Sequence, residues 1–116
     1  MRADSRYETF PEPIYCPFFQ RTLELIGKRW TAAILRCLFA GHNRFSDILA
    51  AVPGLSARLL IERLRELIDA GIVTTPEDGP RGYYYLTERG ADLREALVAL
   101  EEWNDRWTRR ASDDSG

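Results

Sequence analysis

Apolar residues recur at helical spacing through the first half of the chain. Pro17 suits the first turn of a helix because it has no amide proton to leave unpaired, and the apolar pattern that follows it ends at Gly27. A second apolar stripe predicts a helix over about residues 29–40, and a shorter one predicts a helix over residues 45–52. Pro and Gly at 53–54 end this third helix.

The fourth predicted helix has Ser56 as its N-cap, ends near Ala70 and has Gly71 just beyond its end. On a helical wheel one side of it is apolar: Leu60, Leu64 and Leu67. The opposite side is polar: Arg58, Glu62, Arg65 and Asp69. A DNA-reading helix needs this arrangement, because the apolar side fixes it to the preceding helix and long donors project into the major groove. The alternative is a solvated face on which Glu62 pairs with the arginines.

Two β-type stretches follow, over residues 72–75 and 83–86, and residues 76–82 between them are typical of a hairpin loop. Thr87 begins a last helix that is predicted to reach about Trp107. Helices joined by a short turn and followed directly by a hairpin indicate a winged helix-turn-helix, a mainly α fold with a small β-hairpin wing.

The candidate DNA-contacting residues gather around the fourth helix. Those expected to face base edges lie at its start or on its polar side: Ser56, Arg58, Leu59, Glu62 and Arg65. Those expected to hold phosphates are basic residues around it: Arg29, Arg44 and Arg81. Arg29 and Arg44 lie at predicted helix starts. A cation there opposes the helix dipole, so helix stability does not explain why these positions are arginine. Arg81 lies near the hairpin tip, where the alternative is an ordinary loop arginine.

The last helix offers a seam for a second copy of the chain. Leu93, Leu100 and Trp107 are spaced by seven residues, with Ala96 and Trp103 at the complementary heptad position. One domain would hold DNA weakly, so the N- and C-terminal helices are predicted to form a homodimer interface. The assigned residues are Phe18, Phe19, Leu93, Leu97, Leu100, Trp103 and Trp107. The alternative is that this helix packs on the first helix of its own chain.

The two cysteines lie in different settings. Cys16 precedes a helix N-terminus, where partial positive charge favours a thiolate, and it is the redox-sensor candidate. The alternative is inert packing, as expected for Cys37 on the apolar stripe of the second helix. His42 is the single histidine, and one His with two distant Cys gives no zinc spacing. We therefore predict no catalytic residue, metal site or cofactor.

Composition and charge further limit the kind of protein that the sequence can encode. The chain has 116 residues, 45% of them apolar and 29% charged, which fits one compact domain. Its net charge is −2, yet residues 16–90 carry +2 and residues 91–116 carry −3, so DNA binding requires the fold to gather arginines on one face. No apolar run is long enough for a membrane span and no secretory signal is present, so a cytoplasmic location without a membrane partner is expected.

Residues 16–107 are the predicted winged domain. The polar residues 1–15 are expected to form a flexible arm, and residues 108–116 a disordered tail.

Seven short segments, in this order and spacing, resemble the HxlR family of bacterial and archaeal winged-helix regulators, which is related to the MarR group. They are CP at 16–17, IGKRWT at 26–31, RFSDI at 44–48, LS at 55–56, RLREL at 63–67, GIV at 71–73 and YYLTERG at 84–90. The resemblance spans residues 16–103, which is 88 of the 116 residues.

The resemblance implies a dimeric DNA-binding transcription factor whose reading helix is residues 56–70 and whose wing is residues 74–85. It also implies a basic contact at Arg29 and, in some members, sensing of oxidants or electrophiles at the position of Cys16. The combined prediction is a homodimeric, sequence-specific repressor of a pseudo-palindromic operator. The alternatives are a winged-helix module that binds another protein, and a regulator that holds a small apolar ligand at the dimer interface, between the first, second and last helices. The effector itself stays unassigned.

Overall fold

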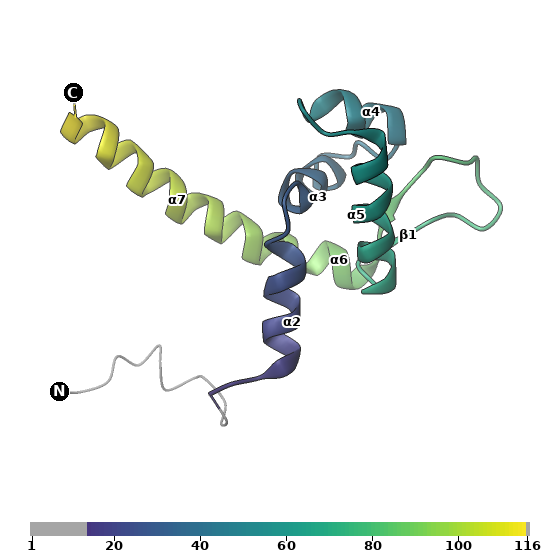
Figure 1. Ribbon diagram of the computed structural model, residues 1–116, viewed down its shortest axis with the longest axis horizontal. Coiled ribbons are helices and arrows are strands. Elements are labelled where there is room, and N and C mark those ends of the chain that lie inside the picture. The colour runs from purple at the N-terminus through teal and green to yellow at the C-terminus, as the bar shows by residue number, and fades with distance from the viewer. Residues whose placement is uncertain (1–13, 116) are drawn as a thin grey trace.

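The helices and the hairpin occur in the predicted order (Figure 1). The structure is a computed structural model that describes residues 14–115, with side chains up to residue 109. Its elements are α2 (Pro17–Ile26), α3 (Thr31–Phe39), α4 (Phe45–Ala51), α5 (Ala57–Asp69), β1 (Val73–Thr74), β2 (Tyr85–Leu86), α6 (Glu88–Asp92) and α7 (Arg94–Ser115). This arrangement confirms the mainly α winged helix-turn-helix.

The hydrophobic core lies where α3, α4 and α5 meet the hairpin. Its fully buried side chains are Ile34, Leu35, Ile48, Leu60, Leu64, Leu67 and Val73. The three leucines of α5 are the apolar side predicted from the helical wheel. Their burial turns the polar side of the same helix away from the core.

The ends of α5 follow the predicted signals. The Ser56 hydroxyl accepts a hydrogen bond from the backbone N–H of Leu59 at 3.1 Å, which satisfies one of the unpaired donors of the first turn. Gly71 has φ +75°, a left-handed conformation that suits glycine just after a helix. The predicted start and end of the reading helix are therefore confirmed.

The wing pairs with the start of α4 as well as with itself. β1 and β2 are antiparallel, with Val73 opposite Leu86 and Thr74 opposite Tyr85. Before β2, the N–H of Tyr84 donates to the carbonyl of Asn43 at 2.8 Å, and the N–H of Phe45 donates to the carbonyl of Gly82 at 2.7 Å. The two strands are shorter than predicted, and residues 82–84 pair with residues 43–45.

The expected single last helix is divided into α6 and α7. Thr87 caps α6 by accepting from the N–H of Gly90 at 3.0 Å. A Cβ at Gly90 would lie 2.1 Å from the carbonyl oxygen of Ile72, so only glycine allows this close approach of α6 to the hairpin. A tight turn at Leu93 follows, with its N–H bonded to the carbonyl of Gly90 at 3.2 Å, and α7 then projects from the body (Figure 1).

α7 continues to Ser115, whereas the sequence predicted a helix end near Trp107 and a disordered tail from residue 108. No proline or glycine occurs between residue 91 and Gly116, and Arg109 pairs with Asp105 at 3.0 Å one turn earlier, so nothing in this segment ends the helix.

The predicted arm over residues 1–15 lies outside the described residues except for 14 and 15. Within residues 14–115, no helix is both long and apolar enough to cross a membrane.

Candidate nucleic-acid interface

The polar side of α5 faces away from the core and is exposed. The Arg58 side chain is 90% exposed, and its Nε lies 3.6 Å from Oε1 of Glu62. Arg65 is also exposed, and it lies one turn beyond Glu62 and two turns beyond Arg58. Leu59 is half-buried against the core, and the hydroxyl of the exposed Ser56 accepts the cap hydrogen bond. The outward face of α5 therefore presents the guanidinium groups of Arg58 and Arg65 together with the carboxylates of Glu62 and Asp69.

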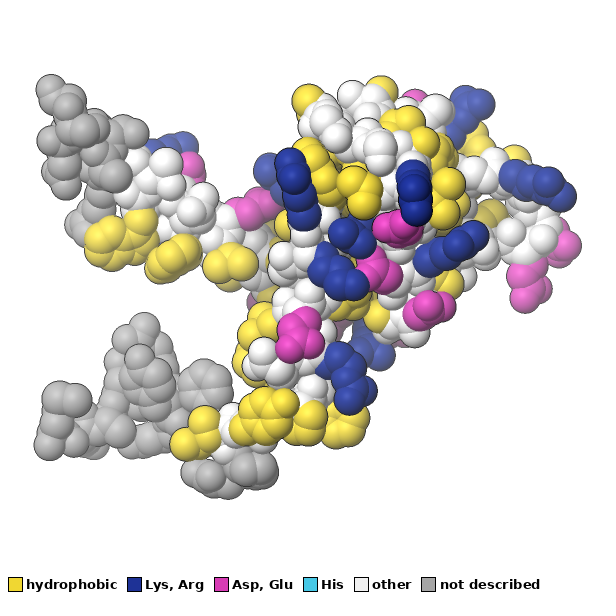
Figure 2. Space-filling view, viewed as in Figure 1, with side chains coloured by type: hydrophobic (Ala, Val, Ile, Leu, Met, Phe, Trp, Pro, Cys, Tyr) yellow, Lys and Arg dark blue, Asp and Glu magenta, His cyan; other side chains and the backbone are white. Residues whose placement is uncertain are grey.

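The three basic residues predicted around α5 are all exposed. Figure 2 shows Lys and Arg side chains spread over the face that carries α5 and the wing. Arg44 is the N-cap of α4, as predicted, and its guanidinium carbon lies 6.0 Å from the centre of the Tyr83 ring. Arg29 directly precedes Trp30, the N-cap of α3, so it lies just before the helix that the sequence predicted from about residue 29. Arg81 lies in the wing loop.

The turn between α2 and α3 is strained and packs beneath the helix-turn-helix. Trp30 has φ +79°, and it is the non-glycine residue with a left-handed backbone in the described part of the chain. Its ring lies under the turn between α4 and α5, where a Cβ at Gly54 would be 3.2 Å from Cη2 of Trp30. The guanidinium carbon of Arg29 lies 4.8 Å from the centre of the Trp30 ring, in a cation–π contact.

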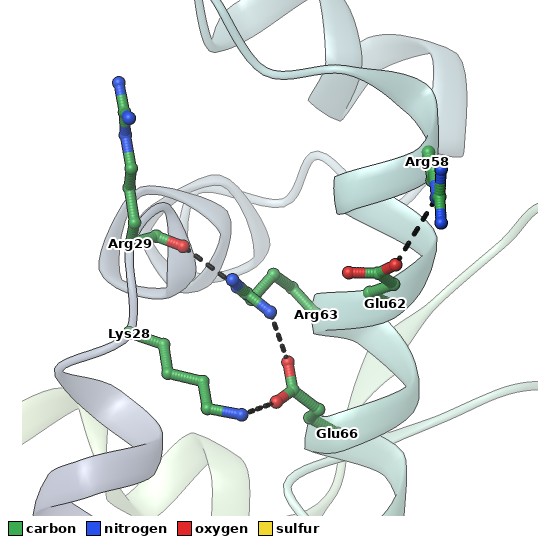
Figure 3. A network of polar contacts seen from close by, with 6 residues as sticks. All are labelled: Lys28, Arg29, Arg58, Glu62, Arg63 and Glu66. Atoms are coloured by element: carbon green, nitrogen blue, oxygen red, sulfur yellow. Dashed lines mark hydrogen bonds and ion pairs between the residues drawn. The ribbon is translucent and has the colours of Figure 1, made fainter.

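A polar network that the sequence did not predict joins this turn to α5 (Figure 3). Nε of Arg63 donates to the backbone carbonyl of Arg29 at 3.0 Å, and Nη1 of Arg63 donates to Oε1 of Glu66 at 2.8 Å. The ammonium group of Lys28 contacts Oε2 of the same carboxylate. Partial burial alone would raise the pKa of Glu66, but the hydrogen bonds from Lys28 and Arg63 outweigh it and hold that pKa below its ordinary value.

Comparison with known proteins assigns the family. The profile of the HxlR-like helix-turn-helix family matches residues 25–112, well over half of the chain. The chain belongs to the HxlR-like helix-turn-helix family. It is therefore a transcriptional regulator with a DNA-binding helix-turn-helix, as the sequence predicted.

Similar proteins include regulators and solved structures from this group. The uncharacterized regulator YvaP of Bacillus subtilis is 41% identical over 95 residues, which cover 79% of this chain and 88% of YvaP. The quinone-bound structure of YodB from B. subtilis has a TM-score of 0.71 and 34% identity, and the match covers 79% of this chain and 99% of YodB. The reduced form of the redox regulator HypR has a TM-score of 0.68 and 29% identity, covering 84% of this chain and 98% of HypR.

The two cysteines of this HxlR-like chain differ in accessibility. Cys16 is the N-cap of α2 and is partly exposed. Cys37 is buried in the core, and this burial raises the pKa of its thiol, more than the nearby Arg36 lowers it. Only Cys16 is therefore accessible to a reagent in solution.

The predicted dimer residues of the HxlR-like chain separate into two groups. Leu97 is 9% exposed and belongs to the core, and Leu93 packs against that core, so these two leucines offer little surface to a second copy of the chain. The other five are exposed: Phe18, Phe19, Leu100, Trp103 and Trp107. They lie on α2 and on the part of α7 that projects from the body (Figure 1).

A groove of about 650 Å³ borders α2, the C-terminal end of α5 and α6. Its lining combines apolar side chains such as Leu25 and Ile72 with charged ones that include the Lys28–Glu66 pair. The sequence placed the alternative apolar-ligand site between the first, second and last helices, so this groove involves α5 in place of α3.

Proposed function

We propose that this chain is a cytoplasmic homodimeric repressor that binds a pseudo-palindromic operator in a sequence-specific manner. The observation that carries the proposal is the exposed face of α5, which carries Arg58 and Arg65, on a side of the molecule where further Lys and Arg side chains are exposed (Figure 2). A helix with an anchored apolar side and outward guanidinium groups fits the major groove, and flanking arginines suit the phosphates on either side.

Arg58 and Glu62 have complementary roles in this proposal. Their contact at 3.6 Å is a surface ion pair, and such pairs stabilise a protein by about 0–1 kcal/mol. DNA can therefore replace it at little cost. Arg58 is then available to guanine, and the Glu62 carboxylate can accept a hydrogen bond from the amino group of cytosine.

The test starts from DNA fragments that the protein selects from a random pool. Arg65→Ala should weaken binding to the selected fragment by about 1–3 kcal/mol and relax the base preference at one position of each half-site. Arg109→Ala is the matched control, because it removes the same charge from α7, far from α5. If the wild-type protein bound selected and unrelated DNA equally at moderate salt, the proposal would be wrong and a protein-binding role would gain support.

Dimerisation would use the exposed apolar residues of α2 and α7. Phe18 is 75% exposed and Trp103 is 52% exposed, and several large apolar side chains exposed on one helix face are typical of interaction sites on soluble proteins. A second copy is the partner with the same two apolar helices, so a twofold interface can bury both. Two reading helices would then face successive major grooves.

A redox response through Cys16 is the regulatory part of the proposal. YodB has been solved bound to quinone, and HypR in reduced and oxidised forms, so similar proteins include redox regulators. Cys16 is the accessible cysteine and begins the helix that carries Phe18 and Phe19. Cys16→Ser should abolish the effect of a quinone or diamide on operator binding, whereas Cys37→Ser should leave it. An unchanged response in Cys16→Ser would contradict this assignment.

A further inference from the structure

We propose that Arg63 and Glu66 are positioning residues: they lock the α2–α3 turn onto α5, so that Arg29 meets a phosphate at a fixed distance from the residues that face the bases. This inference rests on the proposed DNA-binding function and deepens it. Neither residue needs to contact DNA.

The first link is the guanidinium of Arg63. Its side chain is 17% exposed, and its planar group bonds in two directions, to the carbonyl of Arg29 and to the Glu66 carboxylate. Arg29 is 34 residues away in the sequence, so this contact joins two separate segments. Because the acceptor on Arg29 is its backbone carbonyl, the bond fixes the main chain and leaves the side chain available.

The second link is the Glu66 carboxylate, which uses both of its oxygens. One accepts from Arg63 of its own helix, and the other accepts from Lys28 of the turn. The carbonyl of Lys28 in turn accepts from the N–H of Thr31 at 3.2 Å, which closes the turn. Two consecutive residues of the turn are thus attached to adjacent turns of α5. Charge-assisted bonds of this kind are stronger than neutral ones.

The third feature is the direction of the Arg29 side chain. Figure 3 shows its guanidinium pointing away from Arg63, while its carbonyl faces Arg63. The side chain rests on the ring of Trp30, which itself packs against the helix-turn-helix turn at Gly54. Arg29 is therefore held at its backbone by Arg63 and at its side chain by Trp30. Such prior ordering reduces the entropy that is lost when a phosphate binds.

The network also determines which basic side chains near the turn are paired with a carboxylate and which are available to a phosphate. Lys28 and Arg63 are both occupied by Glu66, whereas Arg29 shares no carboxylate with them. The cluster of Lys28, Arg63 and Glu66 keeps a net charge of +1, and Arg29 adds a guanidinium group that shares no carboxylate with this cluster and whose backbone is held by Arg63.

The experiment is a double-mutant cycle on the selected DNA fragment, read as the slope of log Kd against log salt. Arg29→Ala should lower the magnitude of this slope by about 0.9 per phosphate contact, or about 1.8 for a dimer. Arg63→Lys keeps the charge of residue 63 but lacks the two separate nitrogen atoms, Nε and Nη1, with which Arg63 reaches the Arg29 carbonyl and Glu66. It should lower the slope by a similar amount, and adding it to Arg29→Ala should change the slope no further.

Controls separate positioning from a general structural effect. Glu102→Gln removes one carboxylate from an exposed position of α7 and should leave the slope unchanged. Hydrogen exchange of residues 28–31 in the free protein should quicken in Arg63→Lys, without a change at the buried leucines of α5. If Arg63→Lys does not fold, Glu66→Gln enters the same cycle and should show the same non-additivity with Arg29→Ala.

Two results would overturn the inference. One is a slope in Arg63→Lys equal to that of the wild type, and the other is full additivity of the two substitutions in the slope. Both differ from failure of the proposed function, in which the wild-type protein would itself show no preference for the selected fragment.

Discussion

The body of the molecule and its two projecting helices use apolar residues in opposite ways. In the body, the aliphatic side chains that α3, α4, α5 and the hairpin contribute to the core are buried, and of the large aliphatic side chains only Ile61 and Ile68 of α5 are exposed, at 40% and 36%. On α2, and on α7 beyond Leu97, six large apolar side chains are at least half exposed: Phe18, Phe19, Leu23, Leu100, Trp103 and Trp107. The comparison teaches that the body has its own core, whereas the two projecting helices have apolar faces that the body does not cover.

The largest effect is expected when the exposed apolar surface of α7 is made polar. Leu100→Glu combined with Trp103→Glu should dissociate the proposed dimer, because burying each of these side chains contributes about 1.5–3 kcal/mol and each dimer contains two copies. Sedimentation should show a monomer, and circular dichroism should show that the body is still folded. Glu102→Gln, between them on the same helix, is the control. A double variant that sediments as a dimer would exclude α7 from the interface.

A change in the body should act on folding instead. Leu64 is 1% exposed, so Leu64→Ala should lower the free energy of unfolding by about 2–5 kcal/mol through lost burial and a cavity. Urea titration at one fixed protein concentration measures this effect, because dimerisation makes stability depend on concentration. Val98→Ala, at a partly exposed position of α7, is the matched control and should cost far less. Equal losses in the two variants would remove the distinction between the body and the projecting helices.

One substitution in the body should stabilise it. The hydroxyl of Thr31 is buried, and it has no hydrogen-bond partner among the described residues. Thr31→Val replaces that hydroxyl with a methyl group of similar size and should raise the free energy of unfolding by about 1 kcal/mol. Thr22→Val is the control, because the hydroxyl of Thr22 donates to the carbonyl of Phe18 at 3.1 Å. A loss of stability in Thr31→Val would show that its hydroxyl does have a partner.

The smallest expected effect concerns pH. Lys28 and Arg63 hold the pKa of Glu66 below its unfolded value, so the stability from this network is complete at pH 7. It is lost as the pH falls below the ordinary glutamate value of about 4.3 and through the lower folded-state pKa. The difference in urea midpoint between wild type and Glu66→Gln should therefore shrink on acidification. A difference that grows towards low pH would contradict the direction of the shift.

Local rules predicted the parts of the fold that local chemistry decides. The apolar side of α5, its cap at Ser56 and the left-handed Gly71 all follow from spacing and from residue types within a few positions. The helical wheel of the same segment also predicted the outward placement of Arg58 and Arg65. These features required no knowledge of what packs against α5.

Features that depend on distant segments were missed. On the wheel Arg63 lies on the flank of α5, and nothing nearby in the sequence indicates that the carbonyl of Arg29 lies beside it. The pairing of Asn43 with Tyr84 joins segments 41 residues apart, and no local signal indicated it. Leu97 was assigned to the dimer interface, but it packs in the core of its own chain. Each of these features depends on contacts between segments that are far apart in the sequence, so the local pattern did not predict it.

The length of α7 sets a scale for the operator. Its 22 residues, at about 1.5 Å each, make a rod of about 33 Å, close to one turn of duplex DNA. In the proposed dimer, the position along this rod at which the partner packs determines the separation of the two half-sites. Moving the contact by one heptad would shift the copies by about 10.5 Å, or about three base pairs. The spacing of an operator could therefore be changed by substitutions on α7 that leave every base contact as it is.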